Sequence, residues 1–243
     1  MACFIFGSIG LTERFEVKGI EMPAIASSTV DVRSVPGMDG GVLVSNDLDP
    51  LEIKVTCRLT TDTIDPREVQ QAWADAVARI RRAGAQALYL TPDRFRMAVL
   101  AGETPLEYAN YSATGELTFL CADPVAYGRE REITVPSGGS VTFHVDGTYP
   151  TAPTIAAASA VRDGTALVWR LRLDGGAYIA VETGSASARK VDVDCARRVC
   201  KVADAVKLPT LESDWIVLEP GSHTLQMDKG TGAATVTYRE RWL

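Results

Sequence analysis

Residues 115–128 read GELTFLCADPVAYG, and this stretch decides how the chain divides. Leu117, Phe119 and Cys121 stand at every second position, which is the pattern of a strand with one buried face. Pro124 has no N–H to donate and an Asp-Pro pair favours a turn, so the strand ends before it. The sequence therefore predicts a first domain, residues 1–128, closed by this strand, and a second domain, residues 129–243, reached through a hinge.

The first domain combines strands with one helix. Leu51–Leu59 alternates apolar and polar residues and predicts a central strand. Asp65 is a suitable N-cap and Pro66 suits the first helical position. Gly84 is expected to end the helix. An apolar stripe runs along the helix between them: Val69, Trp73, Ala76, Val77 and Ile80. These features predict an α+β sandwich with a single helix.

A segment of the first domain lacks a core pattern. The turn cluster 36–41, PGMDGG, is followed by weakly patterned residues up to Asp49, whereas Thr29–Val35 before it reads as an ordinary strand. We expect the segment from Met38 to Leu51 to act as an arm that contacts a neighbouring subunit. The candidate contact residues are Met38, Val42, Val44, Leu48 and Leu51.

The second domain reads as an all-β sandwich, with short alternating strands separated by glycine-containing turns. Trp215–Leu218 is among the expected strands, and the last one lies in 236–243, VTYRERWL. Its apolar residues need a partner surface, either the sandwich itself or the first domain. We favour a contact with the first domain. The expected inter-domain contact residues are Asp123, Arg239, Arg241 and Trp242.

Charge and hydropathy exclude several classes of function. The chain of 243 residues has a formal net charge of −6. Up to Gly128 there are 11 Lys and Arg against 17 Asp and Glu, and the remainder carries 14 of each, so all the net acidity lies in the first domain. This balance argues against gripping nucleic acid. A membrane span is not expected because no apolar run of about eighteen residues occurs, and the N-terminus does not read as a secretory signal.

The sequence offers no catalytic constellation. The only histidines, His144 and His223, lack ligand-spaced partners, and the five cysteines read as structural thiols of a reducing compartment. Asp192 and Asp194 share a strand face without a calcium loop. We therefore expect no enzymatic activity, no metal site and no cofactor.

Three aromatic residues raise a different possibility, a platform on which sugars stack. Trp169 alternates in phase with Leu171 and is assigned to the core, whereas Tyr178 and Trp215 stay open to either assignment.

Five segments, taken in order, resemble the distal tail proteins of long-tailed (siphovirus-type) bacteriophages or prophages. They are GMDGG at 37–41, the helix opened by Asp65-Pro66, GELTFLCADPVAYG at 115–128, WIVLEPGSHTLQM at 215–227 and VTYRERWL at 236–243. The resemblance extends over almost the whole chain. It implies a mainly β protein with an N-terminal α+β sandwich like that of tail-tube proteins and a C-terminal galectin-like β-sandwich.

The resemblance also implies a structural role in the virion. Such proteins form a homo-hexameric ring at the tail tip, assembled in the bacterial host cytoplasm, that joins the tail tube protein to the tail-associated hub protein of the baseplate. The ring surrounds the DNA exit channel without binding DNA specifically, and the acidity of the first domain suits such a bore. In some phages the outer domain docks receptor-binding proteins. The alternative from another class is a carbohydrate-binding adhesin or lectin-like module that contacts the host surface.

Overall fold

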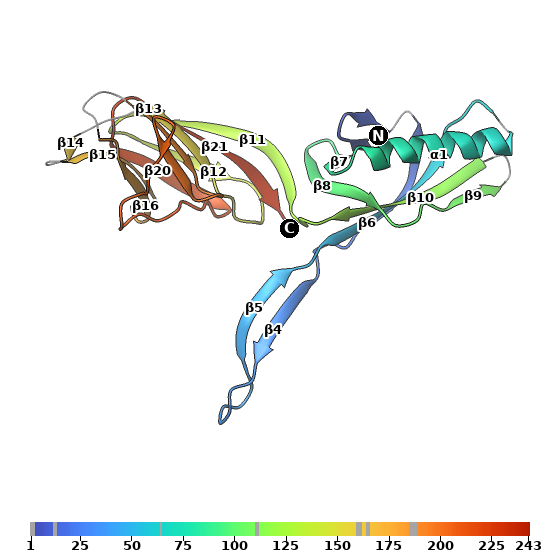
Figure 1. The fold of residues 1–243 in the computed structure, drawn as a ribbon, viewed down its shortest axis with the longest axis horizontal. Coiled ribbons are helices and arrows are strands. Elements are labelled where there is room, and N and C mark those ends of the chain that lie inside the picture. The colour runs from blue at the N-terminus through green and yellow to red at the C-terminus, as the bar shows by residue number, and fades with distance from the viewer. Residues whose placement is uncertain are drawn as a thin grey trace. The chain divides into compact units, whose positions relative to one another are not determined.

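The computed structural model describes residues 3–11, 14–63, 65–109, 112–158, 162–163, 166–184 and 189–243. Within them the chain forms many β-strands and one α-helix, so the predicted fold class is confirmed (Figure 1). The chain separates into two compact units, residues 1–127 with Leu243 and residues 128–242. The boundary falls inside the strand β11 (Ala126–Val135), where a hinge was expected.

The first unit is built on β6 (Leu51–Leu59), which pairs with β3 (Phe15–Glu21) and with β10 (Ser112–Cys121) on its two sides. Its strict alternation of buried and exposed side chains is the one that the sequence predicts. The other strands are β1 (Ile5–Phe6), β2 (Ile9–Gly10), β4 (Ser28–Arg33), β5 (Val42–Leu48), β7 (Gln86–Thr91), β8 (Arg94–Ala101) and β9 (Leu106–Ala109).

Helix α1 (Pro66–Arg82) begins where its capping residues predict. The Asp65 carboxylate accepts a hydrogen bond of 2.8 Å from the backbone N–H of Arg67, which satisfies one of the free donors of the first turn. The apolar stripe is buried as expected, and Trp73 meets Phe15 edge-to-face at 5.5 Å. The helix therefore covers one face of the sheet and closes the first core.

The second unit is a sandwich of two antiparallel sheets. One contains, in spatial order, β19 (Ala205–Val206), β18 (Val199–Val202), β17 (Lys190–Asp194), β13 (Thr154–Ala158), β21 (Ala234–Trp242) and β11. The other contains β12 (Ser140–Val145), β20 (Gly221–Lys229), β15 (Ala166–Leu173) and β14 (Arg162–Asp163), with β16 (Tyr178–Glu182) beside β15.

The core of the second unit contains Trp169, which is fully buried as its alternation predicts. One expected strand is wrong: residues 215–218 are no strand and contribute only a bridge between Leu218 and Thr151. Their side chains still alternate, since Ile216 and Leu218 are buried. The segment therefore packs on the core like a strand but lacks a ladder of hydrogen bonds.

Candidate functional site

The most exposed feature of the first unit is a two-stranded hairpin formed by β4 and β5, called the arm below (Figure 1). It is a separate sheet that extends away from the strands that carry it. The expected arm ran from Met38 to Leu51, but the preceding strand β4 belongs to the hairpin as well. Sequence reasoning missed this because the Val30–Val32 alternation looks the same on a free hairpin as on a core strand.

The arm is amphipathic. Residues opposite one another in a sheet share a face, and the register places Val30 and Val32 on the same side as Leu43. Their side chains are 53%, 56% and 60% exposed. The opposite face carries Asp31 and Asp47. An isolated hairpin is only marginally stable in water, so this exposed apolar face makes the arm a candidate interaction surface.

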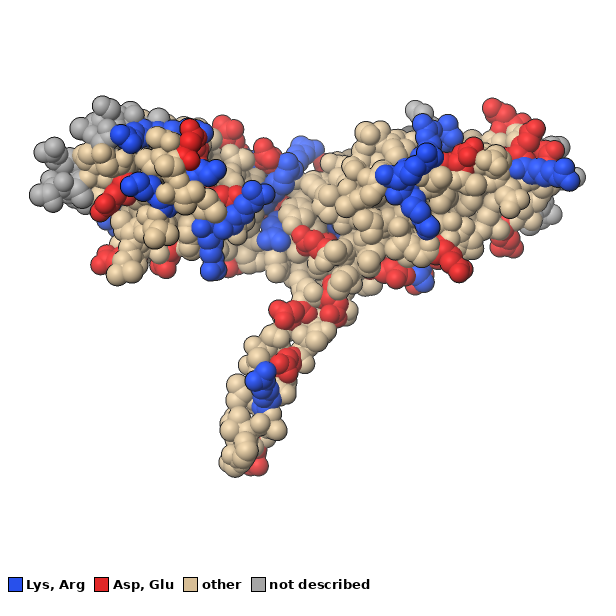
Figure 2. Space-filling view, in the orientation of Figure 1, with Lys and Arg blue, Asp and Glu red and all other residues tan. Residues whose placement is uncertain are grey.

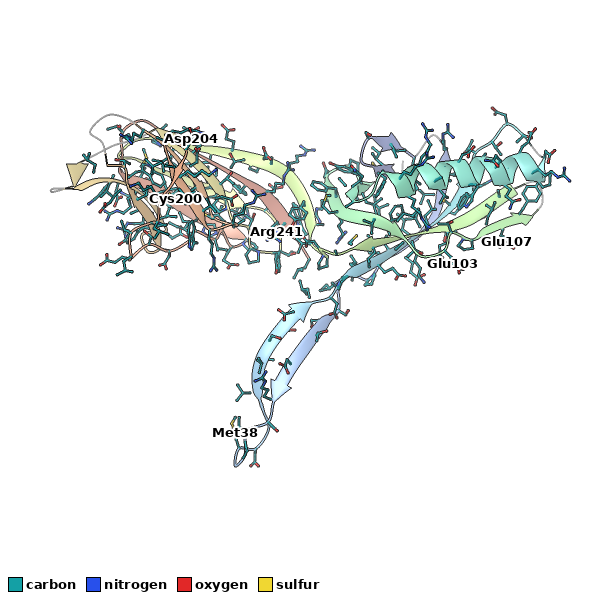
Figure 3. The ribbon with its side chains drawn as sticks, viewed as in Figure 1. Met38, Glu103, Glu107, Cys200, Asp204 and Arg241 are labelled. Carbon is teal, nitrogen blue, oxygen red and sulfur yellow. The ribbon has the colours of Figure 1, made fainter. Side chains whose placement is uncertain are left out.

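Hydrogen bonds fix the base of the arm, and two glycines shape its tip. At the base, Asp49 accepts bonds from Ser27 at 3.0 Å and from Thr29 at 2.8 Å. At the tip, the chain reverses through glycines at positions 37 and 40, both with positive φ, and Met38 is 51% exposed. Met38 stands at the far end of the arm in Figure 3.

Charge on the arm is one-sided. It carries one cation, Arg33, and four carboxylates: Asp31, Asp39, Asp47 and Asp49. Figure 2 shows acidic groups at several points along the arm, with basic atoms at one place. Any surface that receives the arm is therefore expected to be apolar with a basic edge.

A hollow of about 710 Å³ lies beside helix α1 in the same unit. Its helical wall includes Trp73 and Val77, and the small residues Ala74 and Ala78 leave it open. Leu106 and Tyr108, on β9, contribute to the opposite wall. Among the described residues, one charged side chain lines the hollow, that of Arg81, and its guanidinium also donates to the carbonyl of Gly102 at 2.7 Å. We call this hollow the helix groove.

The second unit has a hollow of about 420 Å³ on the outer face of its larger sheet. Its floor includes the small side chain of Ala156 on β13, and Thr237 lies on the adjoining strand β21. The polar lining residues are Thr154, Asp192, Asp194, Arg197, Lys201 and Thr237. We call this hollow the sheet groove. Within the described residues, no group of three or more His, Cys, Asp or Glu side chains is arranged to hold a metal ion.

The predicted subunit-contact residues fall into two groups. Met38, Val42 and Val44 are about half exposed on the arm, and Leu48 ends β5 with a half-buried side chain. Leu51 instead begins β6 and is only 3% exposed in the first core. The arm therefore ends before Leu51, because the alternation that buries β6 begins with that residue.

The four predicted inter-domain residues have these partners in the structure. The carboxylate of Asp123 accepts bonds from the Tyr127 hydroxyl and from the N–H of Val125. The guanidinium of Arg239 donates to Glu130 at 2.9 Å and to the carbonyl of Gly128 at 3.2 Å.

The last residues of β21 are also held within the second unit. Arg241 donates to the carbonyl of Pro150 at 2.9 Å and stands over the ring of Tyr149. Trp242 lies over Gly128, where a side chain would collide with the indole. With Val236 and Tyr238 buried in the second core, the apolar side of β21 belongs to that sandwich. The expected contact of this tail with the first domain stays a prediction.

The aromatic residues open to either assignment lie on the second unit. The guanidinium groups of Arg170 and Arg172 lie over the ring of Tyr178, 5.2 and 5.1 Å from its centre, and the Tyr178 hydroxyl donates to Glu212. Tyr178 is therefore engaged in cation–π contacts within its own unit. Trp215 packs against the second core.

The contacts of His223 change the pKa of its imidazole ring. Its two ring nitrogens lie 2.7 Å from the Asp174 carboxylate and 2.7 Å from the carbonyl of Glu219. Both contacts are to acceptors, and only the protonated ring can donate twice. Burial lowers the pKa of His223, but the hydrogen bonds to Asp174 and Glu219 outweigh it and raise the pKa above its usual value.

Two family models match the chain. A phage tail protein RIFT-related domain covers residues 6–121, and the C-terminal domain of a siphovirus-type tail component covers residues 146–242. The chain belongs to the siphovirus-type distal tail proteins.

Individual relatives of this distal tail protein agree with the family. It is 24% identical to the distal tail protein of Bacillus phage SPP1 over 96% of its own length and 92% of that protein. The crystal structure of the SPP1 Dit protein, described as a paradigm of the hub adsorption apparatus in phages that infect Gram-positive bacteria, aligns over 100% of both chains with a TM-score of 0.78 and 20% identity. A chain of the phage P2 baseplate aligns at 10% identity with a TM-score of 0.46, over 96% of this chain and 92% of that one.

None of the described helices is long and apolar enough to cross a membrane.

Proposed function

We propose that the chain is the hub subunit of a phage tail tip. In this proposal six copies form a ring through their first units, join the tail tube protein above to the tail-associated hub protein below, and surround the channel through which DNA leaves. The role is structural and involves no catalysis or cofactor. Assembly takes place in the host cytoplasm and the product lies at the tip of the virion tail.

The arm is the observation that supports this proposal. A half-exposed apolar face of Val30, Val32 and Leu43 is costly to leave in water, since covering each aliphatic side chain fully is worth about 1.5–3 kcal/mol. A neighbouring copy that covers this face gains that free energy at every interface of the ring. Membership of a family of phage tail components also supports a structural role at the tail tip.

The test is the mass of the assembled particle in solution. We expect light scattering to give six times the chain mass of 26.1 kDa. Changing the apolar face to Val30→Thr, Val32→Thr and Leu43→Ser is expected to give monomers that keep the same circular dichroism. The control changes the polar face, Asp31→Asn with Ser45→Thr, and keeps the ring. A parent chain that is monomeric at all concentrations would exclude the ring, and an intact ring in the apolar-face variant would exclude the arm.

The acidity of the first domain supports the proposed channel. A net charge of −6 up to Gly128 repels a DNA backbone. We expect the assembled ring to show no shift of duplex DNA in low-salt gels, where electrostatic binding is strongest. Retention of DNA under these conditions would contradict the channel assignment.

The sheet groove supports the alternative function, a carbohydrate-binding module that contacts the host surface. Its carboxylates, its hydroxyls, the Lys201 ammonium and the Arg197 guanidinium offer acceptors and donors together, which suits the hydroxyl groups of a neutral sugar. Titration with a saccharide panel, with Ala156→Trp as the variant that fills the floor, tests it. A sugar-binding monomer would favour this module over the hub, whereas a ring without affinity for sugars would favour the hub. In the hub proposal the second unit instead docks receptor-binding proteins.

A further inference from the structure

The proposed ring needs a surface that receives the arm, and the structure offers one. We propose that the tip of the arm of one copy inserts into the helix groove of a second copy, with Met38 in the groove and Asp39 beside Arg81. This inference rests on the proposed ring and adds the receiving half of the interface.

The first argument is the match between apolar surfaces. Met38 is half exposed at the end of the arm, with no core of its own to enter. The groove exposes an apolar lining in which Ala74 and Ala78 stand beside Trp73. A volume of about 710 Å³ accommodates several side chains. Methionine is flexible enough to fill an irregular hollow, and its sulfur makes favourable contacts with aromatic rings.

The charges of the arm tip and of the helix groove are opposite in sign. The arm carries four carboxylates against one cation, and Arg81 is the charged residue among the described residues that line the groove. Asp39 adjoins Met38 in the sequence, so a tip that places the methionine among the apolar residues brings the carboxylate to the edge of the groove. The pairing of an acidic tip with a basic edge also fixes which surface of the neighbour is chosen.

The symmetry of the proposed contact also suits a ring. The arm and the helix groove are different surfaces of one chain, so the contact between copies is head-to-tail. A head-to-tail contact repeats from copy to copy and generates a ring when the rotation closes. The arm and groove therefore provide the two halves of an interface that a cyclic assembly needs.

Disulfide trapping tests the contact directly. We replace Cys3, the one native cysteine that is not buried, with serine and introduce Met38→Cys with Ala78→Cys. Oxidation is expected to produce a ladder of covalent oligomers on denaturing gels, because a disulfide forms only when the two Cα atoms approach within about 7 Å. The matched control pairs Met38→Cys with Gln71→Cys, an exposed residue of the same helix outside the groove lining. A ladder from the first pair alone supports the proposal, whereas no ladder, or equal ladders from both pairs, overturns it.

A charge exchange supplies an independent readout. Asp39→Arg is expected to raise the concentration for half assembly by about tenfold, since it replaces an attraction by a repulsion. Adding Arg81→Glu to that variant is expected to restore assembly. Adding Arg82→Glu instead, which places the same charge on the helix outside the groove lining, is expected to restore nothing. Equal effects of the two helix variants would overturn the assignment.

The outcomes separate this inference from the proposed function. If variants of the apolar arm face dissociate the ring while both the trapping and the charge exchange fail, the ring stands and the helix groove is the wrong receiver. If the parent chain never assembles, the ring proposal falls and this inference falls with it.

Discussion

The indole of Trp73 lies directly against Gly115, joining helix α1 to strand β10 in the first unit. A Cβ at position 115 would stand 2.4 Å from both Cη2 and Cζ2 of the ring and 2.6 Å from the carbonyl oxygen of Pro105. Real Cβ atoms do not approach so closely, so only glycine permits this packing. The indole N–H completes the arrangement with a 3.4 Å bond to the carbonyl of Thr104.

Gly115→Ala is expected to destabilise the first unit by about 1–3 kcal/mol, the usual cost of overpacking a core. The measurement is the free energy of unfolding by urea, with hydrogen exchange of β10 peptides to identify the unit affected. Gly10→Ala is the control, because nothing lies within 4 Å of a Cβ there. Equal stability of the two variants would mean that the ring of Trp73 moves aside without cost.

Asp65→Ala is expected to cost about 0.5–2 kcal/mol by removing the cap of helix α1. The loss should appear as faster hydrogen exchange in the first turn, where the carboxylate now accepts from Arg67. Asp65→Asn keeps the acceptor and is expected to stay near the parent. If alanine and asparagine behave alike, the side chain at this position does not hold the helix end.

Protonation of His223 is expected to stabilise the second unit at low pH. Its pKa is raised in the folded chain, so its contribution is fully present below the ordinary pKa of about 6.5 and disappears as the pH rises through the folded value. Asp174, whose pKa is lowered, stays ionised throughout this range.

Thermal melting between pH 5.5 and 8.5 measures this effect. The melting temperature of the second unit should fall with rising pH in the parent and fall less in His223→Gln. His144→Gln serves as the control, since that ring is largely exposed to solvent. A parent and a His223 variant with parallel pH profiles would contradict the prediction.

Four of the five cysteines are expected to resist thiol reagents in the native protein. Burial raises the pKa of Cys57 and Cys195 to about 12, and that of Cys121 and Cys200 to about 11. The thiolate is the reactive form, so near pH 8 these side chains stay protonated as well as shielded. Labelling should therefore reach Cys3 alone.

The control for this labelling is the same reaction in urea, which should reach all five cysteines. Rapid modification of a second cysteine in native buffer would show that one of the two cores opens on the timescale of labelling.

Local pattern by itself determined a large part of this protein. The capping residues and apolar stripe of 65–80 predict helix α1, and the alternation of Leu51–Leu59 predicts β6, because each depends on neighbours within a few positions along the chain. The burial of Trp169 follows in the same way. The five segments quoted above were enough to indicate the family, which the family models then confirmed.

Only the tertiary structure decided which alternating segments are covered. Val30 and Val32 follow the same period as the core strand β6 but lie on an exposed arm, while Leu51, assigned to that arm, is buried. Residues 215–218 alternate yet pair with no strand. Contacts of His223 with Asp174 and of Trp73 with Gly115 join residues 49 and 42 positions apart in the sequence. Periodicity states which side of a segment is apolar, but the surface that covers it comes from distant parts of the chain or from another copy.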